Sequence, residues 1–312
     1  MDLTRRGFLA AALAIGLAGC VPTPDPRMSV PSDNCTLPDI WQQASASEQK
    51  LAEAYTAATV IKDGADWCQA AATMHAAHAA TLLSCGLMGT YQPPAPIPSQ
   101  GPVDEKTALS QLQKAIEDAT TTATAGLKQA KGSPEALLFA SLLVCCAVGD
   151  AWCADTTVQR TPPIPGTVVP SQIIMSPPAD AAATALDRCY ALSFALTAAL
   201  GQTDSKSQLH KDVAARLTQT GTLASSLQSL IMAAGLTPVP RDLSYDLPYG
   251  LSDDNSILAT WGSIEGSLSQ ACTFLAGCLT GEAATTWATA AGDQMARATA
   301  MGQQLTWWPG WG

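Results

Sequence analysis

The sequence predicts an all-α fold of two four-helix bundles that arose by internal duplication. Three observations lead to this prediction. Apolar residues recur at helical spacing along most of the chain, alanine is abundant while aromatic residues make up only 5%, and short pieces of the first half recur in order in the second. Small side chains at such spacing are typical of closely packed helices.

The first twenty residues have the organisation of a bacterial lipoprotein signal. A charged start precedes the apolar run 8–18, which is too short to span a bilayer, and a Gly-Cys pair follows it. Residues 17–20, Leu-Ala-Gly-Cys, resemble a lipobox, which implies cleavage before Cys20 and a diacylglyceryl thioether on its sulfur. We therefore expect a signal peptide at 1–19 and a lipid anchor at Cys20, on the extracytoplasmic face of the cell membrane.

Residues 4–9, Thr-Arg-Arg-Gly-Phe-Leu, resemble a twin-arginine export signal, with Arg5 and Arg6 as the pair. An ordinary Sec signal with two basic residues is the alternative. Twin-arginine export implies that the protein crosses the membrane folded, which permits loading of a cofactor in the cytoplasm but does not require it. Two acyl chains suffice for stable anchoring.

The charge balance excludes one class of partner. The net charge is −10, and removal of residues 1–19 takes away Asp2, Arg5 and Arg6, which leaves about −11. A protein this acidic repels nucleic acid phosphates and anionic lipid headgroups. We therefore expect no nucleic acid partner; the expected partners are the membrane, through the lipid at Cys20, and an envelope protein or wall component.

Nine cysteines follow Cys20, without a Cys-x-x-Cys pair. Outside the cytoplasm this number predicts disulfides, and the odd count leaves at least one thiol without an intramolecular partner. Cys145 and Cys146 lie about 100° apart on a helix, so we expect that they do not both face one core. The set is Cys35, Cys68, Cys85, Cys145, Cys146, Cys153, Cys189, Cys272 and Cys278.

The mature chain begins with a tether. Residues 20–38 hold the lipidated cysteine and five prolines, which predicts an extended, unpacked segment. An N-terminal bundle (39–155), a linker (156–177) and a C-terminal bundle (178–312) follow. The expected helices are 39–62, 65–87, 104–131, 134–154, 178–201, 204–235, 254–280 and 282–305.

Local signals support individual helices. Ser133-Pro134-Glu135 opens the fourth with a capping hydroxyl, proline at the first position and an early carboxylate. The run 136–148 is nearly all apolar but short, so it predicts a core helix and not a membrane span. The seventh helix has the clearest apolar stripe, formed by Ile257, Trp261, Ile264, Leu268, Ala271, Leu275 and Cys278.

Four short segments of the first half recur in the second half in the same order. They are 51–55 with 186–190, 85–87 with 234–236, 115–117 with 263–265, and 147–150 with 290–293. Each half also places its longest loop between its second and third helices, at 88–103 and 237–253. About 16 extended residues reach roughly 50 Å, whereas a helix of about 22 residues is roughly 33 Å long. Each loop can therefore cross the length of its bundle, as in ferritin-like connectivity.

These features together resemble an actinobacterial family of ferritin-like lipoproteins of unknown function. Residues 39–155, including 74–82, resemble a more divergent N-terminal part of the same proteins. The likeness is strongest in 178–312, through the helix with 186–190, the Ala-Ala-Gly end at 233–235, Tyr-Asp-Leu-Pro at 245–248, Ile-Glu at 264–265 and Pro-Gly at 309–310. The resemblance implies ferritin-like bundles but no specific activity.

Ferritin-like metal enzymes need carboxylates on all four helices and Glu-x-x-His on two of them, and this sequence has no Glu-x-x-His. His75 and His78 share one helix face, and with Glu53 and Glu117 they form a candidate two-histidine, two-carboxylate metal site. Polar residues bonded within the bundle are the alternative, which we prefer, so no catalytic residue, metal ligand or cofactor is assigned. The other candidates are Asp150, Asp187, His210, Glu265 and Asp293.

Three functions are consistent with the sequence. The preferred one is a membrane-anchored envelope lipoprotein that acts as a non-catalytic helical binding or structural module. The others are a ferritin-like metal-dependent oxidase or metal-binding protein, and a small-molecule carrier with a cavity between the halves. The aromatic tail 307–311 is expected to fold back over a bundle end, with a partner-binding or sugar-stacking surface as the alternative.

Overall fold

The computed structural model describes residues 38–84, 104–130, 134–166, 170–171 and 173–311. The predicted signal peptide, with Arg5 and Arg6, and the predicted anchor Cys20 lie outside these residues. Within them the all-α class is confirmed: the regular structure consists of helices, and the β-type pairing is one isolated bridge between Ile164 and Thr306.

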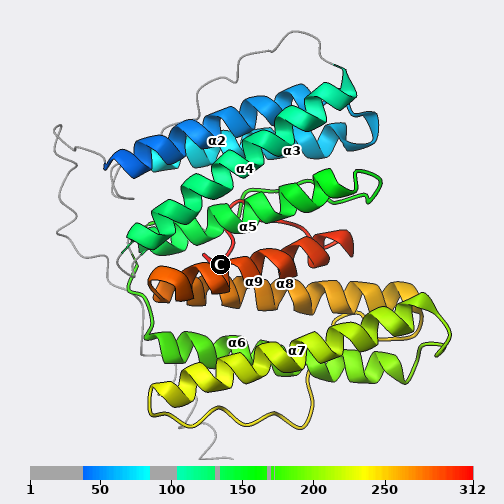
Figure 1. Ribbon diagram of the computed structural model, residues 1–312. Coiled ribbons are helices and arrows are strands. Elements are labelled where there is room, and N and C mark those ends of the chain that lie inside the picture. The colour runs from blue at the N-terminus through cyan, green and yellow to red at the C-terminus, as the bar shows by residue number, and fades with distance from the viewer. Residues whose placement is uncertain (1–37, 85–103, 131–133, 167–169, 172, 312) are drawn as a thin grey trace, which may run out of the picture. The chain divides into compact units, whose positions relative to one another are not determined.

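All eight expected helices are present, each with both ends within five residues of those predicted (Figure 1). The first helix is shorter than predicted, because it stops at Ala58 and the chain continues through a 3-10 turn, η1 (Lys62–Gly64). The helices are α2 (Asp39–Ala58), α3 (Ala65–Leu82), α4 (Glu105–Gln129), α5 (Pro134–Ala154), α6 (Pro178–Leu200), α7 (Gln208–Ala233), α8 (Asp254–Cys278) and α9 (Gly281–Ala300).

Side-chain caps account for several of the helix starts. The side chains of Asp104, Ser207 and Asp253 accept hydrogen bonds from backbone N–H groups in the first turns of α4, α7 and α8. At α8 the contact is reciprocal, because Ser256 Oγ also accepts from the backbone N–H of Asp253. The predicted cap Ser133 lies outside the described residues.

The same packing order occurs in both halves of the chain. In the first half α2 packs on α3, α4 packs on α2, and α5 packs on α4; in the second half α6 packs on α7, α8 packs on α6, and α9 packs on α8. The third helix of each half therefore packs closely on the first helix and not on the second. This order agrees with a crossover connection between the second and third helices.

The described loop after α7 follows the expected crossover path. The guanidinium of Arg241 lies 5.1 Å from the ring centre of Tyr190, and four residues later Tyr245 lies 5.9 Å from Phe194. The loop therefore runs alongside α6 with the same chain direction, and it leads back to the start of α8. The corresponding first-half loop lies outside the described residues, and internal duplication stays a prediction.

The two halves pack directly against each other. Residues Thr36–Gly312 form one compact unit in which α5 packs on both α8 and α9. The approach is close enough to require glycine: a Cβ on Gly277 would lie 2.7 Å from Leu137 Cβ, and a Cβ on Gly292 would lie 2.7 Å from Ala147 Cβ. Packed helices occupy the place where the carrier hypothesis requires a cavity, which argues against that hypothesis.

Helix α5 is the most enclosed helix of this unit. By length and composition it could span a membrane, but 83% of its most apolar 18-residue stretch is buried inside the protein. Because α4, α8 and α9 surround it, both Cys145 and Cys146 are buried in the same apolar cluster. The expectation that they cannot face one core was wrong, because neighbouring helices cover several sides of α5.

The described cysteines do not form the predicted disulfides. Cys68, Cys145, Cys146, Cys153, Cys189, Cys272 and Cys278 are all free thiols. Six are buried and occupy core positions as small apolar side chains. Burial raises the pKa of the Cys68, Cys153 and Cys272 thiols to about 12. Cys20, Cys35 and Cys85 lie outside the described residues.

The C-terminal tail folds back, as expected, but into the interior and not over a bundle end. Its backbone pairs with residue 164: Ile164 N donates to Leu305 O at 3.0 Å, and Trp307 N donates to Ile164 O at 2.9 Å. Trp308 and Trp311 are buried, and the backbone N–H of Gly310 donates to Gln270 of α8. The hydroxyl of Ser141 of α5 donates to the carbonyl oxygen of Pro309, so the tail lies between α5 and α8.

Candidate functional site

A buried carboxylate in the first half contacts two buried histidines. Glu48 Oε2 of α2 lies 2.7 Å from His75 Nδ1 and 2.9 Å from His78 Nδ1, both of α3. All three side chains are at most 2% exposed. We call Glu48, His75 and His78 the histidine centre.

The local sequence explains this convergence. On α2 the buried residues Trp41, Ala44, Glu48, Leu51 and Tyr55 step by three and four, so Glu48 occupies the stripe that faces the core. On α3 the two histidines are three residues apart, which places both on the face toward α2. The predicted carboxylate Glu53 lies five residues beyond Glu48, which turns it about 140° away from the stripe.

Neither predicted carboxylate joins the histidines. Glu53 is half-buried and accepts a hydrogen bond from Gln49 Nε2 at 3.4 Å, while Glu117 is exposed and pairs with Lys114 Nζ at 3.2 Å. The proposed ligand set of Glu53, His75, His78 and Glu117 was therefore wrong in both carboxylates. The sequence did contain a signal for Glu48: it is spaced three and four residues from apolar neighbours that form the buried stripe of α2.

The electrostatics favour an ionised carboxylate. Burial alone would raise the pKa of Glu48, but the charge and hydrogen bond of His75, helped by His78, lower it to about 2. Burial also lowers the pKa of His75, against the opposing effect of Glu48. Among the described residues, His75 Nε2 is buried and has no hydrogen-bond partner.

The C-terminal tail and an aromatic ring cover the histidine centre. The Nε2–H of His78 donates to the carbonyl oxygen of Trp307 at 2.7 Å, and the ring centres of His78 and Trp308 are 4.4 Å apart. Tyr55 stacks on His75 with ring centres 5.2 Å apart and planes at 8°. Cys145 Sγ lies 3.7 Å from the same Trp307 oxygen.

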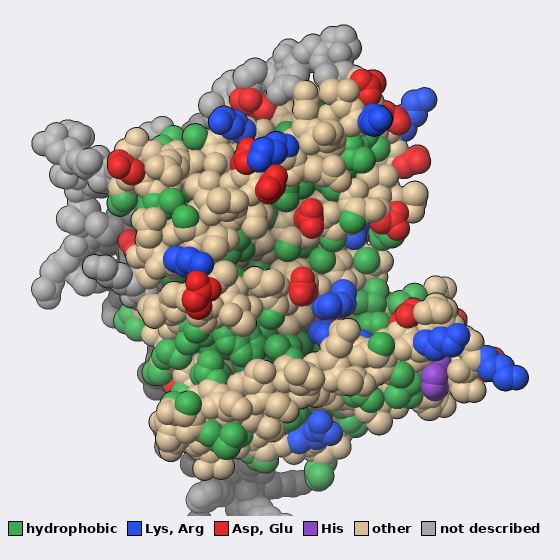
Figure 2. Space-filling model, viewed as in Figure 1, with side chains coloured by type: hydrophobic (Ala, Val, Ile, Leu, Met, Phe, Trp, Pro, Cys, Tyr) green, Lys and Arg blue, Asp and Glu red, His purple; other side chains and the backbone are tan. Residues whose placement is uncertain are grey.

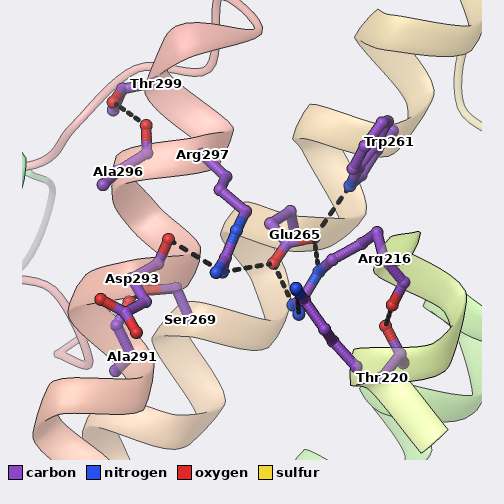
Figure 3. Close-up of polar contacts among 11 residues, drawn as sticks. Arg216, Thr220, Trp261, Glu265, Ser269, Ala291, Asp293, Ala296, Arg297 and Thr299 are labelled. Atoms are coloured by element: carbon purple, nitrogen blue, oxygen red, sulfur yellow. Dashed lines mark hydrogen bonds and ion pairs between the residues drawn. The ribbon is translucent and has the colours of Figure 1, made fainter. Parts of the chain in front are cut away.

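The second half holds a different buried network, which Figure 3 shows. Arg216 of α7 donates twice to Glu265 of α8, through Nε to Oε2 at 3.0 Å and through Nη2 to Oε1. The indole N–H of Trp261 donates to the same Oε2 at 2.9 Å, and Arg297 Nη1 of α9 lies 4.0 Å from Oε1. We call Arg216, Trp261, Glu265 and Arg297 the arginine centre.

The arginine centre joins three helices around one carboxylate. Glu265 is fully buried and Arg216 is 6% exposed, whereas Arg297 is 38% exposed. Burial lowers the pKa of Arg297, and so does the neighbouring charge of Arg216. A bidentate arginine-carboxylate pair of this kind holds both side chains in one geometry.

No protein-family model matches the chain. No curated protein and no solved structure matches it either. The resemblance to ferritin-like lipoproteins therefore stays a prediction, and the geometry of the two centres carries the functional argument.

The other second-half candidates do not gather around Glu265 as metal ligands. His210 lies at the start of α7, where its Nδ1 is 2.9 Å from Thr203 Oγ1. Asp187 lies beside Arg188 at the surface, and Asp150 and Asp293 are exposed.

Arg216 was not among the residues predicted from the sequence, although it lies on the buried stripe of α7. That stripe consists of Val213, Arg216, Thr220, Ala224, Leu227 and Ile231.

Proposed function

We propose that the chain is a membrane-anchored envelope lipoprotein whose helical unit is a non-catalytic binding module. The lipid on Cys20 and the proline-rich tether would hold the unit near the membrane. The observation that carries the proposal is an apolar surface along α7. Figure 2 shows hydrophobic side chains gathered in a band between α9 and α7.

The packing of α7 explains the band. Helix α7 packs closely on α6 and has no comparably close packing on α8 or α9 among the described elements. Its half-buried Leu223 and Leu230 lie on the flank that carries Arg216 and so faces α8. Contiguous exposed apolar surface on a soluble unit is typical of a site for a partner.

The carboxylate and imidazole groups support binding over catalysis. Glu48, His75, His78 and Glu265 are buried, and their side chains bond to one another or to other groups of the protein. A substrate would have to displace the tail to reach the first of these centres. The apolar band, by contrast, is already at the surface.

Photo-crosslinking in intact cells tests the binding face. A photoreactive amino acid at position 230 should yield a crosslinked product of discrete higher mass with an envelope component. The same residue at position 229, which is exposed on the outer face of α7, should yield much less. Equal yields from both positions, or no intermolecular product from position 230, would contradict the proposed face.

A matched pair of double variants tests the same surface. Leu223→Asp/Leu230→Asp places charges in the band, whereas Thr222→Asp/Ser229→Asp places them at the same spacing on the exposed face. We expect only the first pair to abolish the crosslink from a probe at position 219, which is exposed on the same flank of α7 as Leu223 and Leu230. Circular dichroism of both proteins controls for folding.

The anchor and the export route are tested separately. Mass spectrometry of the membrane-extracted protein should find a diacylglyceryl group on Cys20, and Cys20→Ala should leave the signal peptide uncleaved. Arg5→Lys/Arg6→Lys should block export by the twin-arginine route but not by the Sec route, because lysine preserves the positive charge. A processed, unlipidated wild-type protein would contradict the anchor.

A further inference from the structure

The hydrogen-bonding pattern of the histidine centre requires either a proton or a metal ion between His78 and Glu48. The carbonyl oxygen of Trp307 only accepts, so the hydrogen of a neutral His78 sits on Nε2, 2.7 Å from that oxygen. Nδ1 then presents a lone pair to Glu48 Oε2 at 2.9 Å. An ionised carboxylate also only accepts. The two lone pairs would repel each other unless a proton or a metal ion lies between them.

His75, the third residue of the histidine centre, faces the same position beside Glu48. His75 Nδ1 is 2.7 Å from the same Oε2, and one ligand atom from each of the three residues lies within 4.8 Å of the others. Without an ion, the hydrogen of a neutral His75 lies on Nδ1 and is donated to Glu48. Among the described residues Nε2 has no partner, and it can carry that hydrogen instead. In that tautomer His75 presents its Nδ1 lone pair to a bound ion.

We infer that Glu48, His75 and His78 bind one divalent first-row transition metal ion. Imidazole nitrogen and carboxylate oxygen are ligands that zinc, iron and related ions accept. A histidine that binds a metal commonly donates its other ring N–H to a backbone carbonyl, which fixes the tautomer. The bond from His78 to Trp307 is of this kind. The ion would also neutralise the buried charge of Glu48.

The surroundings assign the ion a structural role. The three ligands are almost completely buried, and the tail residues Trp307 and Trp308 cover them. A site closed to solvent contributes to folding, whereas a catalytic site keeps an open position. The ion would therefore enter before the tail docks and would tie α2, α3 and the tail together. This inference is independent of the proposed binding face on α7.

Metal analysis of the full-length lipoprotein is the first test. Protein extracted from membranes and purified without added metal should contain about one transition metal ion per chain, and Glu48→Gln, His75→Asn and His78→Asn should each lower occupancy at least about tenfold. Glu53→Gln and His210→Asn replace the same residue types elsewhere and should retain the metal. Equal occupancy in all five variants would overturn the site.

A test on the wild-type chain avoids variants that do not fold. Protein unfolded with a chelator and refolded with Zn²⁺ should bind one equivalent and melt at a higher temperature than protein refolded without it. Cobalt substitution then reports the ligands: a visible spectrum with histidine and oxygen ligation supports the site, and a thiolate charge-transfer band adds Cys145.

Nuclear magnetic resonance separates the two positive species. If a proton on His78 occupies the position, ¹⁵N spectra of the native protein show hydrogen on both ring nitrogens of His78; if the proton is on Glu48, His78 carries hydrogen on Nε2 alone and its Nδ1 shift does not respond to Zn²⁺. Either result, together with no binding of Zn²⁺, would overturn the inference. A metal-bound His78 instead has hydrogen on Nε2 alone, and its Nδ1 shift moves when Zn²⁺ is removed.

Discussion

His78 and Trp307 are 229 residues apart in the chain, yet the histidine Nε2 lies 2.7 Å from the tryptophan carbonyl oxygen. This bond joins the second helix of the first half to the end of the second half. The tail is therefore part of the core, and its removal should affect the histidine centre as well as global stability.

Replacement of Trp308 by alanine should destabilise the protein strongly. The indole is 6% exposed and packs against the His78 ring, and a large-to-small change of a buried tryptophan costs about 3–5 kcal/mol. Chemical denaturation followed by circular dichroism measures the difference. Leu243→Ala, at a fully exposed side chain, should change stability little. Similar effects of the two variants would show that the tail is not docked in solution.

The contact between the halves is tested by adding single methyl groups. Gly292→Ala places a Cβ 2.7 Å from Ala147 Cβ, and overpacking of this kind destabilises by about 1–3 kcal/mol. Gly221→Ala in α7 has nothing within 4 Å of the new Cβ and should stabilise by about 0.5–1 kcal/mol through helix propensity. Thermal or urea unfolding of both variants gives the signs. Stabilisation by Gly292→Ala would contradict the close packing of α9 on α5.

The arginine centre should show strong coupling between its two main members. Arg216→Met leaves Glu265 buried with the indole N–H of Trp261 and the more distant charge of Arg297. Loss of one partner of a buried pair destabilises by about 3–5 kcal/mol. Glu265→Gln leaves Arg216 without its counter-charge. The double variant should be less destabilised than the sum of the single variants, with a coupling of about 0.5–3 kcal/mol. Additive effects in urea unfolding would mean that the pair does not form.

The seven described thiols should differ in reactivity. Cys278 is the one that is not fully buried, and burial raises its thiol pKa to about 11. Because the thiolate is the reactive form, alkylation of Cys278 should be slow at pH 8 and accelerate as the pH approaches 11. The other six should react only after unfolding. Peptide mass spectrometry after timed alkylation measures this order, and rapid labelling of Cys68 or Cys272 in the native protein would contradict their burial.

The helices themselves were predictable from the sequence, because their signals are local. The stripe from Ile257 to Cys278 predicts α8, and Pro134 correctly predicts the start of α5. The crossover in the second half was likewise expected from the length of the loop 237–253. Each of these features depends on residues within a few turns of one another.

The choice among buried polar residues was decided by the tertiary structure. Glu48 and Glu53 are chemically identical, and only the face that packs on α3 distinguishes them. Arg216 gains its partner from α8, and the Trp307 carbonyl reaches His78 across almost the whole chain. The described cysteines are free thiols and not the predicted disulfides, and six of the seven are buried in the core. Local sequence determined the helices; long-range packing decided which polar side chains they bury together, because that depends on contacts between distant segments.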